Sequence, residues 1–182
     1  KELNKRQKVW IDNYFTTAIF PILTPLAVDP SHPFPFISNL SLNLAAIIVD
    51  SESDKEQFTR IKIPGESISR FISIPIELHN NESTKYTGIA IEQIIANNLS
   101  MLFPGMSVKE YSFFRVTRDA DLELRDIEAD DLMSALEEGL RKRRKGGEVV
   151  RLEVSTNTPK VILDLLQEGM NIDKENLYQI GG

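Results

Sequence analysis

The segment from Phe20 to Asn43, FPILTPLAVDPSHPFPFISNLSLN, decides how the rest of this sequence is interpreted. It holds five of the nine prolines, interleaved with phenylalanine, leucine and isoleucine. Each proline removes a backbone N–H and fixes its own φ, and the residue before it is pushed out of the helical region. The segment therefore forms neither a regular helix nor an interior strand. Because a surface loop rarely contains so many large apolar residues, we expect an ordered, extended connector pinned to the body of the protein.

Composition limits the class of protein. The 182 residues are 41% hydrophobic, which is enough for one domain with a buried core. The absence of cysteine excludes a disulfide framework, cysteine zinc sites and thiol catalysis. The net charge of −6 argues against general nucleic-acid binding, and no apolar run is long enough to cross a bilayer. The chain starts in a helical pattern and ends without a tail, so we expect a piece of a larger, cytoplasmic protein.

The spacing of apolar residues predicts the order of helices and strands. A helix over residues 1–19 ends at Pro21, and Pro75 marks a strand end or a sheet edge. Three strands are expected first, as an antiparallel meander, near residues 40–49, 57–63 and 71–76. A helix (89–102), a strand (108–117), a second helix (127–145), a strand (150–154), a helix opening with Thr158 at its N-cap and Pro159 after it, and a short strand (177–180) follow.

This order predicts the fold class. We expect an α+β fold, in which a single compact domain has a mixed, largely antiparallel sheet with packed helices. Residues 1–19 form an N-terminal helix or arm, and residues 20–182 form the domain itself, beginning with the proline-rich extended segment. The continuous apolar run of the first strand, Leu44 to Val49, predicts a sheet that is covered on both faces.

The sequence offers little catalytic chemistry. Neither phosphate-loop pattern, GxxxxGK[ST] or GxGxxG, occurs, and the only histidines are His32 and His79. His32 lies close to Asp29, and this pair leaves open a small metal- or phosphate-dependent hydrolase. A phosphohistidine, however, needs arginines aimed at its pocket, and no such cluster adjoins His32. A structural or surface role for His32 is therefore the expectation.

Two blocks of the sequence resemble a known family. The proline segment, extended to IFPILTPLAVDPSHPFPFISNLSLNLA, is similar to the start of the middle, or head, domain of bacterial polyphosphate kinases that use a phosphohistidine intermediate. The motifs FPG (103–105) and FRVTRDADL (114–122) resemble a second pair of elements in that family. The later segments EEGLRKRR, VVRLEV and LYQIGG extend the resemblance over nearly the whole chain.

The resemblance implies a function for a longer parent protein. The parent would be a kinase that reversibly transfers the γ-phosphoryl group of ATP to polyphosphate, with magnesium. The phosphorylated histidine and the arginines that hold ATP lie in two later domains of such enzymes, so no catalytic, cofactor-binding or metal-binding residue is expected here. The implied partners of this head domain are the N-terminal and C-terminal domains of the same chain, a second copy in a homo-oligomer, and polyphosphate. Peripheral membrane association of the parent stays open.

Phe34 and Phe36 are the first candidates for an interface or for framing the substrate tunnel. Pro33 and Pro35 stiffen this stretch, and the two rings project to the same side if it is strand-like. We expect both rings to be fixed against the domain body or a partner subunit. The alternative function is a stand-alone interaction module that binds its partner through this proline- and phenylalanine-rich segment.

Four arginines complete the candidates. Arg115 and Arg118 flank the end of a predicted strand, and we expect them to pair with the acidic residues at 119, 121 and 123; contact with a neighbouring domain or the active-site entrance is the alternative. Arg143 and Arg144 belong to the basic run 141–145 at a predicted helix end. There they complement the helix dipole, and a polyphosphate contact is again the alternative.

Overall fold

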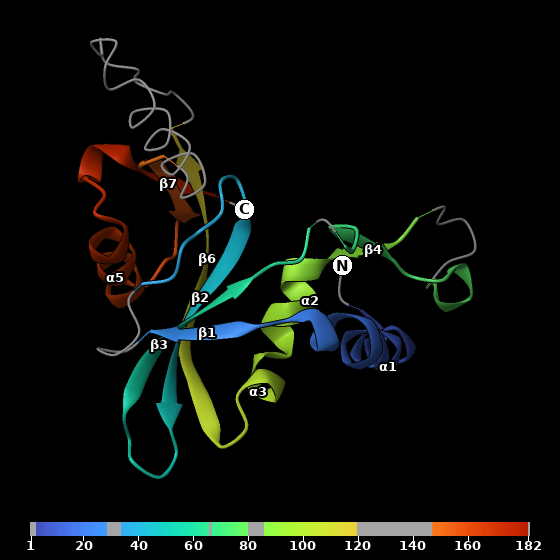
Figure 1. Ribbon diagram of the computed structural model, residues 1–182. Helices are drawn as coiled ribbons and strands as arrows, with labels where there is room; N and C mark the ends of the chain where they lie inside the picture. The colour runs from blue at the N-terminus through green and yellow to red at the C-terminus, as the bar shows by residue number, and fades with distance from the viewer. Residues whose placement is uncertain (1–2, 29–33, 66, 80–85, 120–146, 182) are drawn as a thin grey trace, which may run out of the picture.

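The computed structural model describes residues 3–28, 34–65, 67–79, 86–119 and 147–181. The predicted helix over 127–145, with Arg143 and Arg144, lies outside these residues, as do Asp29 and His32. Within them, a six-stranded mixed sheet has helices on both faces, and a two-stranded sheet stands to one side of it (Figure 1). The α+β fold class with a largely antiparallel sheet is confirmed. None of the described helices is long and apolar enough to span a membrane.

The large sheet has the strand order β1-β3-β2-β6-β7-β8. Its members are β1 (Pro25–Val28), β2 (Leu42–Asp50), β3 (Glu56–Lys62), β6 (Met106–Arg118), β7 (Val149–Ser155) and β8 (Leu177–Ile180). All neighbours are antiparallel except β7 and β8, which are parallel and are joined through the helix α5 (Lys160–Met170). This crossover is what makes the sheet mixed.

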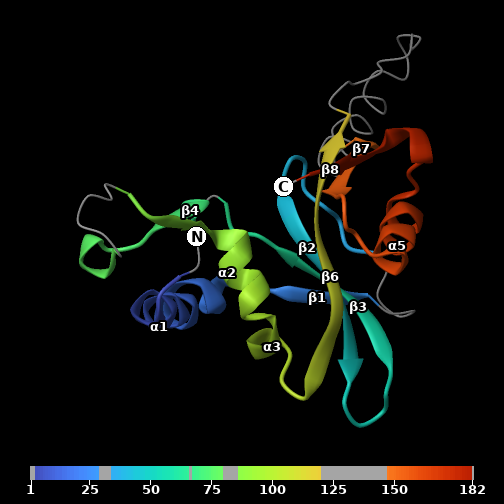
Figure 2. The ribbon, with the colours of Figure 1, turned by 180° about the vertical axis from the view of Figure 1, so that it is seen from behind.

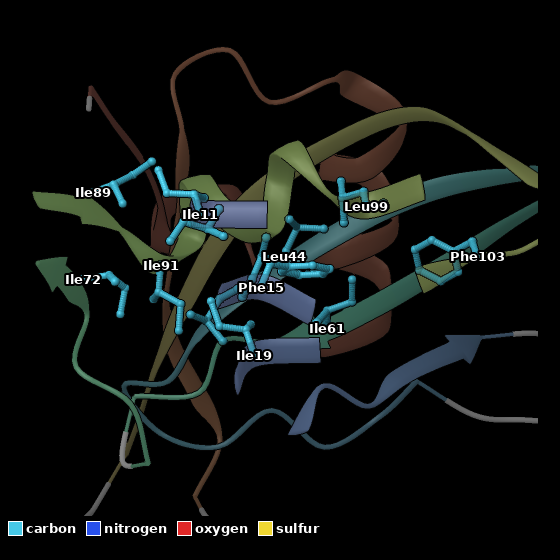
Figure 3. Close-up of a cluster of buried hydrophobic side chains, with 14 of the residues drawn as sticks. Ile11, Phe15, Ile19, Leu44, Ile61, Ile72, Ile89, Ile91, Leu99 and Phe103 are labelled. Atoms are coloured by element: carbon cyan, nitrogen blue, oxygen red, sulfur yellow. The ribbon is translucent and has the colours of Figure 1, made fainter. Parts of the chain in front are cut away.

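One face of the sheet is covered by the N-terminal helix and by two short helices. The helix α1 (Lys5–Tyr14) continues into a π-helical turn (Phe15–Ile19) and a 3₁₀ turn (Phe20–Ile22), while α2 (Ile91–Asn97) and α3 (Leu99–Leu102) lie beside it. Ile11, Phe15 and Ile19 are buried against Leu44 and Ile61 of the sheet (Figure 3). The N-terminal helix is therefore an integral part of the core.

The opposite face is covered by α5 and by residues 34–37. Ile162 and Leu166 of α5 pack on the alternate side chains of β2, Ala45 and Ile47. The ring of Phe34 lies so close to Gly169 of α5 that a Cβ at that position would overlap it. The predicted cover on both faces is thus confirmed for β2, and it explains why this strand is apolar at every position in its middle.

The proline segment contains a strand that the sequence did not predict. β1 pairs with β3 at the edge of the sheet, and Pro25 is its first residue, where the missing N–H costs no interior ladder bond. The expectation that the segment forms no interior strand is consistent with this edge position. Pro21 lies in the 3₁₀ turn that follows the π-helical turn, so the helical conformation extends slightly past the predicted end.

Two other predictions need correction. The third strand does not join a meander: β4 (Phe71–Ser73) pairs with β5 (Gly88–Ala90) in the separate two-stranded sheet, because the chain turns away from β3 after Lys62. Pro75 follows the end of β4, as predicted. The last helix begins at Lys160 with Pro159 at the N-cap. The Thr158 hydroxyl donates to the Ser155 carbonyl oxygen (2.7 Å) instead of capping that helix.

Candidate functional site

A groove of about 670 Å³ lies between the start of α2 and the part of the sheet that the first group of helices leaves uncovered. Its walls come from residues 38–42 before and in β2, residues 62–65 at the end of β3 and after it, the first turn of α2, and the facing parts of β6, β7 and β8. Figure 2 shows α2 and the chain end after β8 on either side of this region. Segments distant in sequence therefore meet at one place on the molecule.

One wall of the groove holds an arginine–glutamate pair. Nε and Nη2 of Arg70 both donate to Oε1 of Glu92, at 3.0 and 2.7 Å. Glu92 lies in the first turn of α2 and is only 9% exposed. Its second oxygen, Oε2, is buried and accepts no hydrogen bond from any described residue. A buried acceptor without a donor is unfavourable.

Arg115 and Glu153 line the facing wall, and the row of side chains to which they belong continues beyond the groove. The strand register places Arg115 of β6, Glu153 of β7 and Tyr178 of β8 side by side. Oε2 of Glu153 accepts from Nε and Nη2 of Arg115 (2.7 and 2.6 Å), and Oε1 accepts from Nε of Arg151 (2.8 Å). The Arg151 guanidinium lies 3.8 Å from the centre of the Tyr178 ring. One carboxylate therefore orients two arginines.

The environment of Glu153 alters its ionisation. Burial raises the pKa of this carboxyl group, but the hydrogen bonds from Arg115 and Arg151 outweigh burial and hold the pKa below its ordinary value of 4.5. Two of the partners expected for Arg115, the acidic residues at 121 and 123, lie outside the described residues, and among those described Arg115 pairs with Glu153. The reason is the register, which puts Glu153 directly opposite Arg115 on the neighbouring strand.

Arg118 has a different role from Arg115. Its Nε donates to the Ile37 carbonyl oxygen and its Nη1 to the Gly147 carbonyl oxygen, both at 2.7 Å, and the guanidinium lies 4.2 Å from the centre of the Phe36 ring. These contacts are with carbonyl groups and an aromatic ring, whereas the expected acidic partners at 121 and 123 lie outside the described residues. Burial lowers the pKa of Arg118. The side chain joins the proline segment to the start of β7.

The two candidate phenylalanines have different environments. The ring of Phe34 is half-buried and lies 5.7 Å from the ring of Phe58, centre to centre, in the core between the sheet and α5. Phe36 is 53% exposed and is held by the Arg118 guanidinium. Residues 34–38 form no strand, so the strand-like condition for two rings on one side is not met. Phe34 is fixed by packing, whereas Phe36 is fixed by a cation–π contact.

The described residues include one histidine. Nε2 of His79 lies 2.9 Å from the Ile74 carbonyl oxygen. Because a carbonyl oxygen can only accept, Nε2 carries the proton in this contact and is not a free nucleophile. Among the residues that the structure describes, no group of three or more histidine, cysteine, aspartate or glutamate side chains could hold a metal ion.

Most residues of the groove carry no signal in the sequence that would bring them together. The alternation in Arg151-Leu152-Glu153-Val154 signals that Arg151 and Glu153 share one face of a strand, and it could have identified that pair. No sequence signal links Arg70 with Glu92, which are 22 residues apart. Their contact depends on how the two-stranded sheet packs beside α2.

Comparison with known proteins identifies the family. A family model described as the polyphosphate kinase middle domain matches residues 6–182. The chain belongs to this family. The polyphosphate kinase of Prochlorococcus marinus (strain MIT 9313) is 58% identical over 183 residues, and the alignment covers 100% of this chain and 26% of the relative. The polyphosphate kinase of Mycolicibacterium gilvum (strain PYR-GCK) is 38% identical over 181 residues, covering 100% of this chain and 24% of the relative.

The middle domain thus spans about a quarter of the length of these curated relatives. A solved structure, the crystal structure of polyphosphate kinase from Porphyromonas gingivalis, matches with a TM-score of 0.75 and 24% identity. That match covers 100% of this chain and 24% of the solved chain. At this identity the likeness establishes the fold of the middle domain. The resemblance predicted from the two sequence blocks is confirmed.

Proposed function

We propose that this middle domain is the non-catalytic head of a polyphosphate kinase. The parent enzyme reversibly transfers the terminal phosphate of ATP to polyphosphate through a phosphohistidine. The observation that supports this proposal most strongly is the match of the middle-domain model to residues 6–182, together with relatives named polyphosphate kinase at up to 58% identity. ATP, magnesium and the phosphorylated histidine belong, in this proposal, to other parts of the longer protein.

The chemistry of the described residues is compatible with a supporting role. Nε2 of His79 is held by a carbonyl oxygen. Arg70 and Arg115 each donate two N–H groups to a glutamate, and Arg118 donates to two carbonyl oxygens. These arginines are fixed by protein groups, as expected of side chains that shape a surface.

The head would support the catalytic parts in two ways. It would help frame the tunnel through which polyphosphate passes, and it would take part in the contacts of a dimer. Its partners are then the N-terminal and C-terminal domains of the same polypeptide and a second copy of the enzyme, in the cytoplasm. Phe36 and Arg115 are exposed side chains near such contacts in this proposal.

Labelling with γ-phosphate-labelled ATP and Mg²⁺ tests the proposal. We expect the full-length enzyme to acquire an acid-labile, alkali-stable label and to extend polyphosphate, whereas the 182-residue chain acquires no label. A His32→Ala variant of the chain is the matched control. Acid-labile label on the chain that disappears in this variant would contradict a non-catalytic head.

A further inference from the structure

We propose that Arg60 and Lys62 of β3 form a binding site for a phosphate group. This site goes beyond the proposed function, because it rests on the surroundings of these two side chains and not on the reaction of the longer enzyme. The ligand is a tetrahedral oxyanion, either free orthophosphate or one phosphate unit of a polyphosphate chain. Three features support the site: a buried guanidinium, a second cation beside it, and access from solvent.

The first feature is the buried arginine. Arg60 is 5% exposed, and no other arginine among the described residues is buried. Its Nε donates to Oδ1 of Asn43 (2.8 Å), whereas its Nη1 and Nη2 form no hydrogen bond with a described residue. Asn43 is a neutral partner and is itself fully buried. Because a buried cation without an anion is unfavourable, this guanidinium is suited to a negatively charged ligand.

The arginines of the neighbouring strands differ from Arg60 in their partners. Arg115 and Arg151 both donate to the carboxylate of Glu153. Arg118 donates to two carbonyl oxygens. Burial lowers the pKa of Arg60, but an arginine side chain stays protonated in proteins. Loss of a proton therefore does not remove the need of Arg60 for an anion.

The second feature is another cation on the same side of the strand. In the register of β3 and β2, Arg60 lies opposite Ala45, and Lys62 lies opposite Asn43. Ala45 belongs to the core between the sheet and α5. Since opposite residues share a side of the sheet, and so do residues two apart on one strand, Arg60 and Lys62 both project there, with Cα atoms about 6–7 Å apart. Among the described residues, no carboxylate forms an ion pair with either cation.

The third feature is access from solvent to a site that is already oriented. Lys62 is exposed and lines the groove together with Ser38 and Ser41. Nδ2 of Asn43 donates to the carbonyl oxygen (2.8 Å) and to Oγ (3.1 Å) of Ser41. These two bonds turn Oδ1 of Asn43 toward Arg60, where it accepts from Nε. The guanidinium is therefore held in place, and the anion approaches it from the end of the groove at Lys62.

The arrangement of donors selects phosphate over other anions. Nη1 and Nη2 of Arg60 form one edge of a planar group, and such an edge donates two parallel hydrogen bonds to two oxygens of an oxyanion. The Lys62 ammonium can bind a third oxygen, which a carboxylate does not have. A phosphate dianion also balances both positive charges, whereas chloride carries one charge and has no oxygen acceptors.

Chemical labelling of the full-length enzyme tests the site. We expect orthophosphate to slow acetylation of the Lys62 amine by acetic anhydride several-fold and in a saturable way, as measured by mass spectrometry of peptides. Sodium chloride at equal ionic strength should have little effect on the difference between lysines, because screening acts on all exposed charges. Lys109 is the internal control, since it is also exposed and pairs with Glu56.

Three results of this labelling would overturn the proposal. They are no protection of Lys62, equal protection of Lys62 and Lys109, and a Lys62 that does not react even without phosphate, because another part of the polypeptide then covers it. Long-chain polyphosphate distinguishes the two sources of the ligand. Protection at far lower concentrations of phosphate units than with orthophosphate supports a site for the chain, and protection at similar concentrations supports a site for the free ion.

Variants of the full-length enzyme separate a bound anion from a change in lysine reactivity. Arg60→Gln should abolish the protection of Lys62 by phosphate, and protection that persists would contradict the site. Because Arg60 is buried, this variant can fail to fold, so Lys62→Gln, at an exposed position, gives a second test. Phosphate should raise the unfolding temperature of Lys62→Gln less than that of the wild type, while Lys109→Gln responds as the wild type does. An identical response of all three proteins would refute the proposal. Neither readout requires turnover, so both are independent of the proposed function.

Discussion

Two halves of one sheet face are built from different residues. Where α1 and α2 cover the sheet, the face consists of side chains such as Leu44, Ala46 and Ile61, all fully buried. Farther across the same face, the neighbouring side chains on β6, β7 and β8 are Arg115, Glu153 and Tyr178. The side chains change from apolar to polar where the cover provided by α1 and α2 ends. The composition of a strand therefore reports what covers it, and polar strands can belong to the same sheet as apolar ones.

The largest effect is expected in the covered half. Phe15 is fully buried beneath the sheet, and Phe15→Ala should lower the free energy of unfolding by about 3–5 kcal/mol, because it removes apolar contact and leaves a cavity. Tyr178→Ala, in the uncovered half, should cost at most about 1 kcal/mol in the 182-residue chain. Chemical denaturation of both variants measures the two values. Similar losses would show that the two halves do not differ as described.

The contrast also explains which parts of the fold the sequence predicts. The run from Leu44 to Val49 predicted a strand covered on both faces, because each face of β2 meets its own core. Helical spacing predicted α1 and α5, since both bury a regular stripe. The spacing of apolar residues in these elements follows from which side chains are buried, so the sequence alone predicts them.

Pairings between distant segments were not predictable in this way. β4 has the alternation of a strand, but alternation does not say which strand it joins, and it pairs with β5 instead of β3. The edge strand β1 is short and starts with a proline, so it has almost no strand pattern. The groove is harder still, because the pairing of Arg70 with Glu92 depends on two such long-range arrangements.

A second prediction compares two phenylalanines that are close in sequence. Phe34 packs on Phe58 in a core, so Phe34→Ser should cost roughly 2–4 kcal/mol of stability. Phe36 is exposed and contacts the Arg118 guanidinium, so Phe36→Ser should cost about 1 kcal/mol or less. Thermal unfolding of the single variants and of the double variant tests this. Equal costs would mean that exposure does not separate the two positions.

A third prediction compares two arginines near the end of β6, Arg115 and Arg118. Arg118→Leu leaves the carbonyl groups of Ile37 and Gly147 without their donors and should cost about 1–3 kcal/mol. Arg115→Leu removes an exposed ion pair and should cost about 1 kcal/mol or less. Urea titration of the 182-residue chain measures both. A larger loss for Arg115 would reverse the assignment of Arg118 as the structural residue.

The smallest effect concerns the pH dependence of the uncovered half. Burial raises the pKa of Glu153, but the hydrogen bonds from Arg115 and Arg151 lower it more, so the folded-state pKa lies below 4.5. A carboxyl group whose pKa is depressed on folding contributes stability above its unfolded pKa, and that contribution is lost as pH falls through the folded value. The stability difference between the wild type and Glu153→Gln should therefore be largest at neutral pH, at about 1 kcal/mol or less, and should shrink below pH 4.5.

The control for this prediction is the same substitution in a chain that also carries Arg115→Leu and Arg151→Leu. Removing both donors eliminates the hydrogen bonds that depress the pKa, so Glu153→Gln should then show much less pH dependence. Urea titrations at several values between pH 7 and pH 3 measure both differences. If the pH dependence persists without the arginines, another group controls Glu153, and the row across the three strands is not the electrostatic unit that separates the uncovered half from the covered one.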